Sequence, residues 1–204
     1  MCPACLAALA DDGARFCLRC GGAQEGRPRH LLQAACARAA HEDFRARCLF
    51  WMRAPMPALI HQFKYRGVTR LAETWGPALG QLLTGGLAVD LVLPVPLHPA
   101  AEARRGYNQA ALLARLAARE AGLPCIEDAL ARARRTPTQT RLDPLERRRN
   151  LAGAFEARRP ELLRGRRVAL VDDVVTTGAT LSAAVEALKS AGAEKVRCVG
   201  VARA

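Results

Sequence analysis

Apolar stretches of strand length alternate with helical patterns along most of this chain. The two clearest apolar runs lie at 90–96, where prolines stop the run, and at 166–172. Both are continuous, which is typical of parallel strands buried on both faces. Shorter strands are predicted at 45–52, 130–132 and 195–202. Apolar positions with helical spacing predict helices at 31–45, 57–66, 69–83, 108–121 and 180–191.

This order of elements determines the fold class that we expect. Strands that alternate with helices predict an α/β protein with a doubly wound parallel sheet. With 204 residues, the chain is long enough for one ordinary α/β domain and a small appendage. We divide it into a cysteine-containing segment at 1–25, a connecting helix and strand at 26–52, and the main domain at 53–204.

Two pairs of cysteines lie near the start of the chain, Cys2 with Cys5 and Cys17 with Cys20. Each pair encloses two residues, and this spacing suits four thiolates around one tetrahedral Zn²⁺. A segment with so few apolar residues needs metal binding in order to fold. Disulfides and a redox dithiol are the alternatives, but we find no export signal and no βαβ pattern in this segment. We therefore predict a small N-terminal zinc ribbon at 1–25.

Two further cysteines, Cys36 and Cys48, leave a second metal site open. With His30 and His41 they supply enough ligands for one, but no two of them have the close spacing of a metal-binding turn. Cys36 lies on an apolar helical face, so we favour free buried thiols.

The net charge of +12 comes almost entirely from arginine, since the only lysines are Lys64, Lys189 and Lys195. A basic surface suits a polyanionic partner, either nucleic acid or a phosphate-rich substrate. Mutational bias toward alanine and arginine explains the same composition, and charge alone does not separate these readings. No apolar run approaches the roughly 18 residues of a membrane helix, and we find no signal peptide, so we expect a cytoplasmic protein.

The apolar run Val168–Val171 leads directly into two adjacent acids, Asp172 and Asp173. Ligands of open α/β sheets bind at the carboxyl ends of the strands, so these carboxylates are candidates for binding sugar hydroxyls. A small, hydroxyl-rich loop then leads into a helix, through Val174, Val175, Thr176, Thr177, Gly178, Ala179 and Thr180. Backbone N–H groups and hydroxyls at a helix N-terminus bind phosphate. The segment predicts a site for a phosphorylated sugar, and an acid pair that only caps a turn is the alternative.

A polar segment at 132–150 is rich in arginine and has no clear periodicity. Long polar loops inside a compact domain are often functional. A lid over the site and a solvated surface loop are both compatible with this composition.

Several further motifs accompany the acid pair: KYRG at 64–67, LPVP at 93–96, RGYNQ at 105–109, RxTxxQ at 134–139 and RNLAGAF at 149–155. The acid pair and its loop are similar to the signature of type I phosphoribosyltransferases that binds 5-phosphoribosyl 1-diphosphate (PRPP). Together with the cysteine pairs, the whole set resembles the ComF family of competence-associated proteins over nearly the whole chain. The resemblance implies a type I phosphoribosyltransferase-like sheet with an N-terminal zinc ribbon.

The resemblance also implies roles for particular residues. Asp172 and Asp173 are expected to accept hydrogen bonds from the ribose hydroxyls and to favour the positive charge that develops on the ring as diphosphate leaves. Residues 174–180 are expected to bind the 5′-phosphate. The turn after Val95 and Pro96, with Arg105 downstream, is expected to meet the diphosphate, although a surface role for Arg105 stays open. Mg²⁺ would bridge the diphosphate and the ribose hydroxyls and be held mainly by the substrate.

Two accounts of function remain open on the sequence alone. In the first, the chain is an enzyme that transfers phosphoribose from PRPP to an unknown nitrogenous acceptor. In the second, it is a non-catalytic PRPP sensor or nucleic-acid-binding accessory protein that acts through its partners. The resemblance implies a link to DNA uptake, with competence helicase and channel proteins as partners. Single-stranded DNA and a second copy of the chain, in a homodimer, are further candidates.

Overall fold

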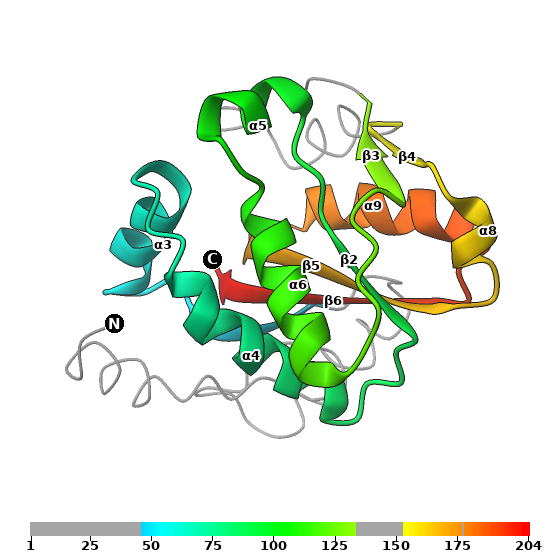
Figure 1. Cartoon of the computed structure of the whole chain (residues 1–204), viewed down its shortest axis with the longest axis horizontal. Helices are drawn as coiled ribbons and strands as arrows, with labels where there is room; N and C mark the ends of the chain where they lie inside the picture. Colours follow the sequence, from blue (N-terminus) through cyan, green and yellow to red (C-terminus); the bar gives the residue numbers. More distant parts are fainter. Residues whose placement is uncertain (1–45, 134–152, 177) are drawn as a thin grey trace, which may run out of the picture.

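The computed structural model describes residues 46–133, 153–176 and 178–204. Within these residues, four strands form one sheet in the order β1-β6-β5-β2 (Figure 1). The strands are β1 (Ala46–Trp51), β2 (Leu91–Pro94), β5 (Arg167–Val175) and β6 (Lys195–Arg203). Every pair of neighbours is parallel. The expected α/β architecture with a parallel sheet is therefore confirmed.

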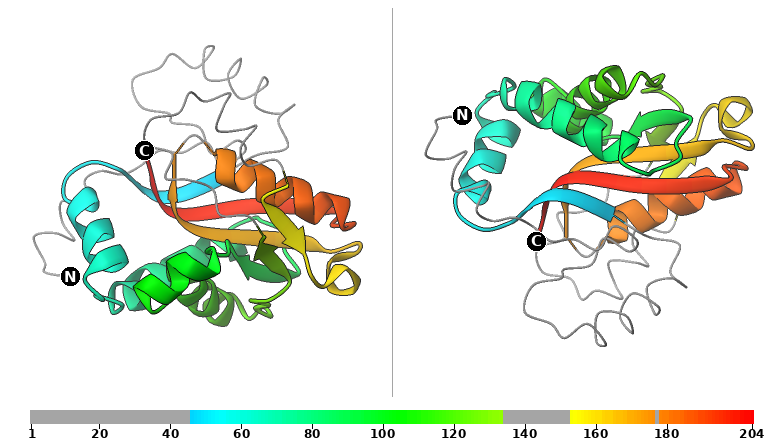
Figure 2. Two further views of the ribbon diagram at one scale, coloured as in Figure 1. Left: turned by 90° about the horizontal axis from the view of Figure 1, so that it is seen from above. Right: turned by 90° about the horizontal axis from the view of Figure 1, so that it is seen from below.

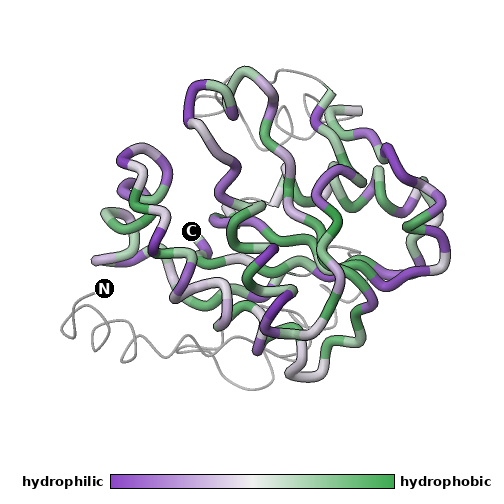
Figure 3. Tube along the Cα trace, in the orientation of Figure 1, coloured by the Kyte–Doolittle hydropathy of each residue, from purple (hydrophilic) through white to green (hydrophobic). Residues whose placement is uncertain are grey.

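Helices cover both faces of this sheet. The helices α3 (Met56–Tyr65), α4 (Leu71–Thr84) and α6 (Gln109–Ala121) lie on one side, and α9 (Ala179–Ser190) lies on the other (Figure 2). Successive side chains of a strand point to opposite faces, so the continuous apolar run of β5 serves both layers. Leu170 packs in the cluster that contains Leu188 of α9, whereas Val171 packs in the cluster that contains Leu113 of α6. The central strands are accordingly among the most apolar parts of the chain (Figure 3).

Two glycines allow α4 and α6 to approach closely. A Cβ atom at Gly76 would lie 2.3 Å from the Cβ of Leu116, and one at Gly80 would lie 2.7 Å from the carbonyl oxygen of Ala117. Neither position leaves space for a side chain, so the two helices pack almost backbone to backbone. This contact fixes where α6 begins, and its beginning lies beside the carboxyl end of β2.

A second, smaller sheet was only partly expected. It pairs β3 (Leu130–Arg132) with β4 (Phe155–Ala157) in antiparallel fashion, and β4 packs against α9. The strand at 130–132 was predicted, but β4 and the short helices α5 (Pro99–Arg105) and α8 (Pro160–Leu163) were not. Elements of three to seven residues are too short to show a hydrophobic period.

The remaining elements correspond closely to the expected ranges, with one difference that concerns the acids. The strand expected at 166–172 continues to Val175, because Val174 and Val175 pair with Ala202 and Arg203 of β6. The acids therefore lie inside the strand. β1 belongs to the segment 26–52 that we set apart as a connection, and it pairs with β6.

The predicted zinc ribbon at 1–25, the helix at 31–45 and most of the arginine-rich loop at 132–150 lie outside the described residues. Among the helices that are described, none combines the length and the apolar character that crossing a membrane would need.

Candidate functional site

The two acids lie near the carboxyl end of β5, in the middle of the sheet. Asp172 pairs in register with Gly200 of β6, and the amide of Asp173 donates a hydrogen bond of 2.8 Å to Oδ1 of Asp172. Because the strand is pleated, the two side chains leave it on opposite sides. Each carboxylate therefore meets a different set of neighbours.

Asp173 faces the layer that contains α3. Its Oδ2 lies 3.1 Å from Nζ of Lys64, which is in the last turn of α3. The Asp173 side chain is only 7% exposed and that of Lys64 is 21% exposed, so this ion pair is largely shielded from water. A buried carboxylate needs a compensating charge, and Lys64 supplies it.

Asp172 is half-buried and lies closer to the other layer. The pKa of Asp172 is raised to about 8, mainly by burial and next by the neighbouring Asp173, while Lys64 acts in the opposite direction. Burial is the main cause of the raised pKa of the Cys198 thiol, and the nearby Asp172 raises that pKa further. Burial lowers the pKa of the Arg132 guanidinium, and Asp172 opposes this effect. Arg132 therefore lies within electrostatic reach of the acid pair.

The loop that follows the acids leads into the N-terminus of α9. Val174 and Val175 complete β5, Thr176 is exposed, and Thr177 lies outside the described residues. Gly178 precedes the helix with φ of +78°, a conformation that favours glycine. It offers no side chain to cap α9, so the N–H groups of the first turn, where Ala179 and Thr180 lie, can bind an anion.

The turn after β2 lies beside these elements. The amide of Val95 donates to the carbonyl of Val171 at 2.8 Å, one residue before the acid pair. The carbonyl of Val95 accepts a hydrogen bond of 3.1 Å from Nδ2 of Asn108, whose Oδ1 caps α6 at the amide of Ala110. The predicted residues Val95 and Pro96 are thus held close to the carboxyl end of β5.

Arg105, the last residue of α5, contacts the end of α3. Its Nη1 donates to Oε1 of Gln109 at 2.9 Å, and its Nη2 lies 3.5 Å from the hydroxyl of Tyr65. The guanidinium also stacks over the Tyr65 ring, 5.1 Å from its centroid. These contacts join Arg105 to Tyr65 and Gln109 rather than to the carboxylates, and its expected contact with a diphosphate stays a prediction.

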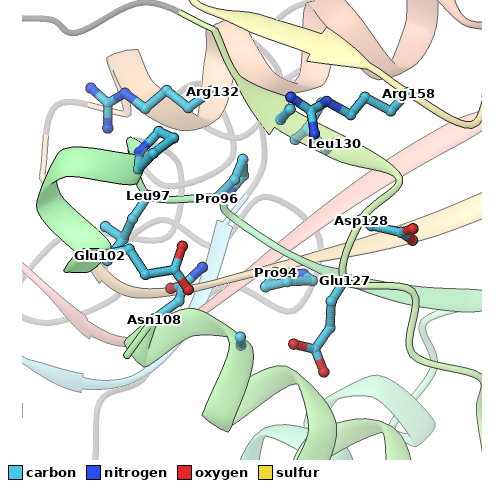
Figure 4. A pocket seen from close by; sticks show the side chains of 13 residues that line it. Pro94, Pro96, Leu97, Glu102, Asn108, Glu127, Asp128, Leu130, Arg132 and Arg158 are labelled. Carbon is cyan, nitrogen blue, oxygen red and sulfur yellow. The ribbon is translucent and has the colours of Figure 1, made fainter. Parts of the chain in front are cut away.

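A pocket of about 270 Å³ opens between the turn after β2, the start of α6 and β3. Pro94, which pairs with Val171 of β5, lines it, so the pocket lies next to the strand that carries the acid pair, and the acids themselves are not part of its lining. Its apolar lining is Pro94, Pro96, Leu97, Pro99, Ala111, Leu130 and Ala131. Figure 4 shows Arg132 and Arg158 on one side, and Glu102, Asn108 and Glu127 on the opposite side. The volume lies just below the roughly 300–1,000 Å³ usual for small-molecule sites.

The cysteines divide into two groups. The predicted zinc ligands Cys2, Cys5, Cys17 and Cys20 lie outside the described residues, as does Cys36. Cys48, Cys125 and Cys198 are free thiols, and burial raises the pKa of Cys48 to about 12. Cys48 is therefore an inert core residue, as we favoured. In the described part of the chain, no three metal-binding side chains gather in one place.

Sequence reasoning missed several residues of this site. Lys64 was quoted only within a motif, and the acidic and basic pocket residues Glu102, Glu127, Asp128 and Arg158 were not considered. One signal was present for Lys64, since a lysine is rare in a chain whose basic residues are nearly all arginine. The pocket residues come from α5 and from separate loops, and they gave no pattern to detect.

Comparisons with known proteins agree with this geometry. A family model described as the phosphoribosyl transferase domain matches residues 103–204. Competence protein F of Haemophilus influenzae is 35% identical over 157 residues, which cover 74% of this chain and 69% of that protein. DNA utilization protein YhgH of Escherichia coli O157:H7 is 37% identical over 153 residues, which cover 70% of this chain and 65% of that protein.

Among solved structures, glutamine phosphoribosylpyrophosphate amidotransferase from B. subtilis, in complex with ADP and GMP, is 20% identical to this chain. The matched region covers 68% of this chain and 30% of the amidotransferase chain, with a TM-score of 0.47.

Proposed function

Since this chain belongs to the phosphoribosyl transferase domain family, in the group that contains competence protein F, we propose that it binds PRPP at the acid pair and transfers phosphoribose to a nitrogenous acceptor. In this reaction the bond between C1′ and the diphosphate oxygen breaks, and diphosphate leaves with the electron pair. The acceptor nitrogen then bonds C1′ and loses its proton. The single observation that supports this best is the acid pair beside the uncapped N-terminus of α9.

Each part of PRPP has a matching group in this proposal. The ribose hydroxyls donate to Asp172 and Asp173, and the 5′-phosphate binds the loop at 174–180 and the first turn of α9. The diphosphate lies toward the turn after Val95 and Pro96. Mg²⁺ would accompany PRPP and would be held mainly by the oxygens of the ligand, as this ion prefers, and the nearby carboxylates would favour its charge.

The pocket beside the acid pair supports the enzyme over the sensor. A PRPP sensor needs only the phosphate loop and the acids, whereas a transferase needs a second cavity next to C1′. The cavity lined by Pro94, Leu130 and Arg132 lies next to the strand that carries the acids and combines an apolar lining with charged side chains. Such a lining suits a planar ring whose N–H groups reach Glu102 or Glu127.

Isothermal titration with PRPP and Mg²⁺ tests the first half of this proposal. The wild-type chain should bind, and the double substitution Asp172→Asn with Asp173→Asn should weaken binding at least about 100-fold, because two hydrogen bonds to charged acceptors are lost. Both proteins should show the same far-ultraviolet circular dichroism. Unchanged affinity in a folded double variant would place the PRPP site elsewhere.

Release of diphosphate separates the two accounts of function. The chain is incubated with PRPP, Mg²⁺ and a panel of purine, pyrimidine and amine acceptors, and diphosphate is measured. Release with one acceptor, but not without it, supports the transferase. Binding without release for any acceptor supports the sensor, which remains the second candidate. The names of the relatives, competence protein F and DNA utilization protein, favour a role of either kind in handling DNA.

We also propose that the thiolates of Cys2, Cys5, Cys17 and Cys20 hold one structural Zn²⁺. The support is the spacing of the two cysteine pairs and the small apolar content of residues 1–25.

A further inference from the structure

Lys64 reaches the acid pair from a part of the chain that the family match does not include. The match begins at residue 103, whereas Lys64 lies in the last turn of α3. Its ammonium group nevertheless lies 3.1 Å from Oδ2 of Asp173. The charge at the centre of the site therefore depends on a helix that comes before the matched domain.

The backbone around Lys64 is fixed by the RGYNQ segment at 105–109. The hydroxyl of Tyr107 donates to the carbonyl of Phe63, and Nε2 of the buried Gln109 donates to the carbonyl of Lys64 at 3.5 Å. Phe63 itself is fully buried and packs edge to face on Trp75, with 5.4 Å between the ring centroids. The end of α3 is thus held at three successive residues, because Arg105 also contacts Tyr65.

The charged groups that face the acids explain why a cation is needed here. Lys64 of α3 faces Asp173, and Arg132 of β3 lies within electrostatic reach of Asp172. On the other strands, Asp172 faces the neutral thiols of Cys198 in β6 and Cys48 in β1. Two carboxylates in a partly buried site repel each other, so one of them tends to take up a proton unless a cation compensates.

We propose that Lys64 is a positioning residue of the phosphoribosyl site, which keeps Asp173 ionised and oriented so that this carboxylate can accept the ribose hydroxyls. Lys64 acts through Asp173 and not on the ligand. A carboxylate has two oxygens and about four acceptor positions, so Asp173 can keep the ammonium group and still accept from a hydroxyl. This inference deepens the proposed function and rests on it for the identity of the ligand.

The pH dependence of PRPP affinity tests this role. Affinity is measured with Mg²⁺ between about pH 6.5 and about pH 9 for wild type, Lys64→Met, Lys64→Arg and the control Lys195→Met, which removes an exposed lysine at the opposite end of the sheet. At neutral pH we expect Lys64→Met to bind about tenfold more weakly or worse, because without the ammonium group the acid pair holds its proton more tightly than in wild type. By about pH 9 the deficit should shrink to about threefold or less, because the acids ionise without help.

The other variants make the result specific. Lys64→Arg should retain most of the affinity, since it restores a cation, and Lys195→Met should match wild type at every pH. A deficit of Lys64→Met that is the same at every pH would mean that Lys64 contacts the ligand directly or supports only the fold, and this would overturn the proposal. No deficit at all would overturn it equally.

A ligand-free measurement keeps this inference separate from the proposed function. The aspartate carboxyl carbons are followed by NMR as the pH is raised, in wild type and in Lys64→Met. We expect the acid pair to lose its proton about one unit higher in the variant. If wild type fails to bind PRPP, the proposed function is wrong, and this titration still decides the role of Lys64. An unchanged titration would overturn that role, whatever the ligand is.

Discussion

At the scale of single residues, the two neighbouring acids differ in their surroundings more than in their chemistry. Asp173 is compensated by Lys64, whereas Asp172 lies among buried thiols and within electrostatic reach of Arg132. Burial raises the pKa of Asp172 to about 8, so in the ligand-free protein this acid is mostly protonated at neutral pH.

This difference predicts how stability depends on pH. Because the pKa of Asp172 is higher in the folded protein than in the unfolded chain, the folded state binds the extra proton between about pH 4 and about pH 8. The stability that this proton provides is present in full at about pH 4, and it is lost as the pH rises toward about 8. Asp172→Asn should therefore be more stable than wild type by about 1–3 kcal/mol at about pH 8, and the two proteins should differ little in stability at about pH 4.

Urea unfolding at several pH values measures this difference. Thr74→Ala, which changes an exposed side chain without a charge, is the control and should show no such trend. A difference between Asp172→Asn and wild type that does not grow with pH would contradict the raised pKa of Asp172.

The acids themselves were predictable, and their partner was not. The run of four apolar residues before Asp172 located the strand and its polar end from local sequence alone. Lys64, in contrast, lies more than a hundred residues earlier, and apart from the rarity of lysine in this chain nothing in the local pattern of its helix connects it with the acids. Only the packing of α3 against the sheet brings it to Asp173, and local patterns do not report such packing.

At the scale of elements, the hydrophobic period located most helices and strands, and tertiary contacts decided where they end. β5 continues past the acids because β6 offers partners as far as Arg203. The helix predicted at 108–121 begins one residue later, at Gln109, because Asn108 serves as its cap. Such boundaries depend on the neighbouring strand or on a capping side chain, so sequence periodicity gives them only approximately.

The close contact between α4 and α6 gives a prediction at this scale. In Gly80→Ala the new Cβ would lie 2.7 Å from the carbonyl oxygen of Ala117 and 2.6 Å from the Cβ of Glu120. The helices must then separate, and we expect a loss of about 1–3 kcal/mol, although alanine favours a helix by about 1 kcal/mol over glycine. Thr74→Ala, at an exposed position of the same helix, should change stability by no more than about 0.5 kcal/mol.

Chemical denaturation of both variants makes this comparison directly. If Gly80→Ala is as stable as wild type or more so, then α4 and α6 do not pack as closely as the glycines indicate.

At the scale of the whole molecule, the site is assembled from both halves of the chain. The residues that match the family, 103–204, contain the acids, the loop at 174–180 and α6. β1, α3, α4 and β2 precede them, yet they supply two of the four strands of the parallel sheet and the cation that faces Asp173. The matched domain therefore provides the acid pair and the loop that follows it, and the preceding elements of this chain complete their surroundings.

The N-terminal cysteines give the last prediction, because they decide whether this chain carries a metal-bound appendage. Four thiolates at this spacing satisfy one tetrahedral ion, and metal binding is worth about 10–16 kcal/mol in small zinc domains, enough to fold a segment without a core.

Elemental analysis of the purified chain should find one zinc per molecule, and Cys17→Ser with Cys20→Ser should remove it. The control Cys125→Ser changes a free, half-buried thiol of the main domain and should keep the metal. Absence of zinc from wild type would contradict the ribbon, and two ions per chain would instead bring Cys36 into a second site.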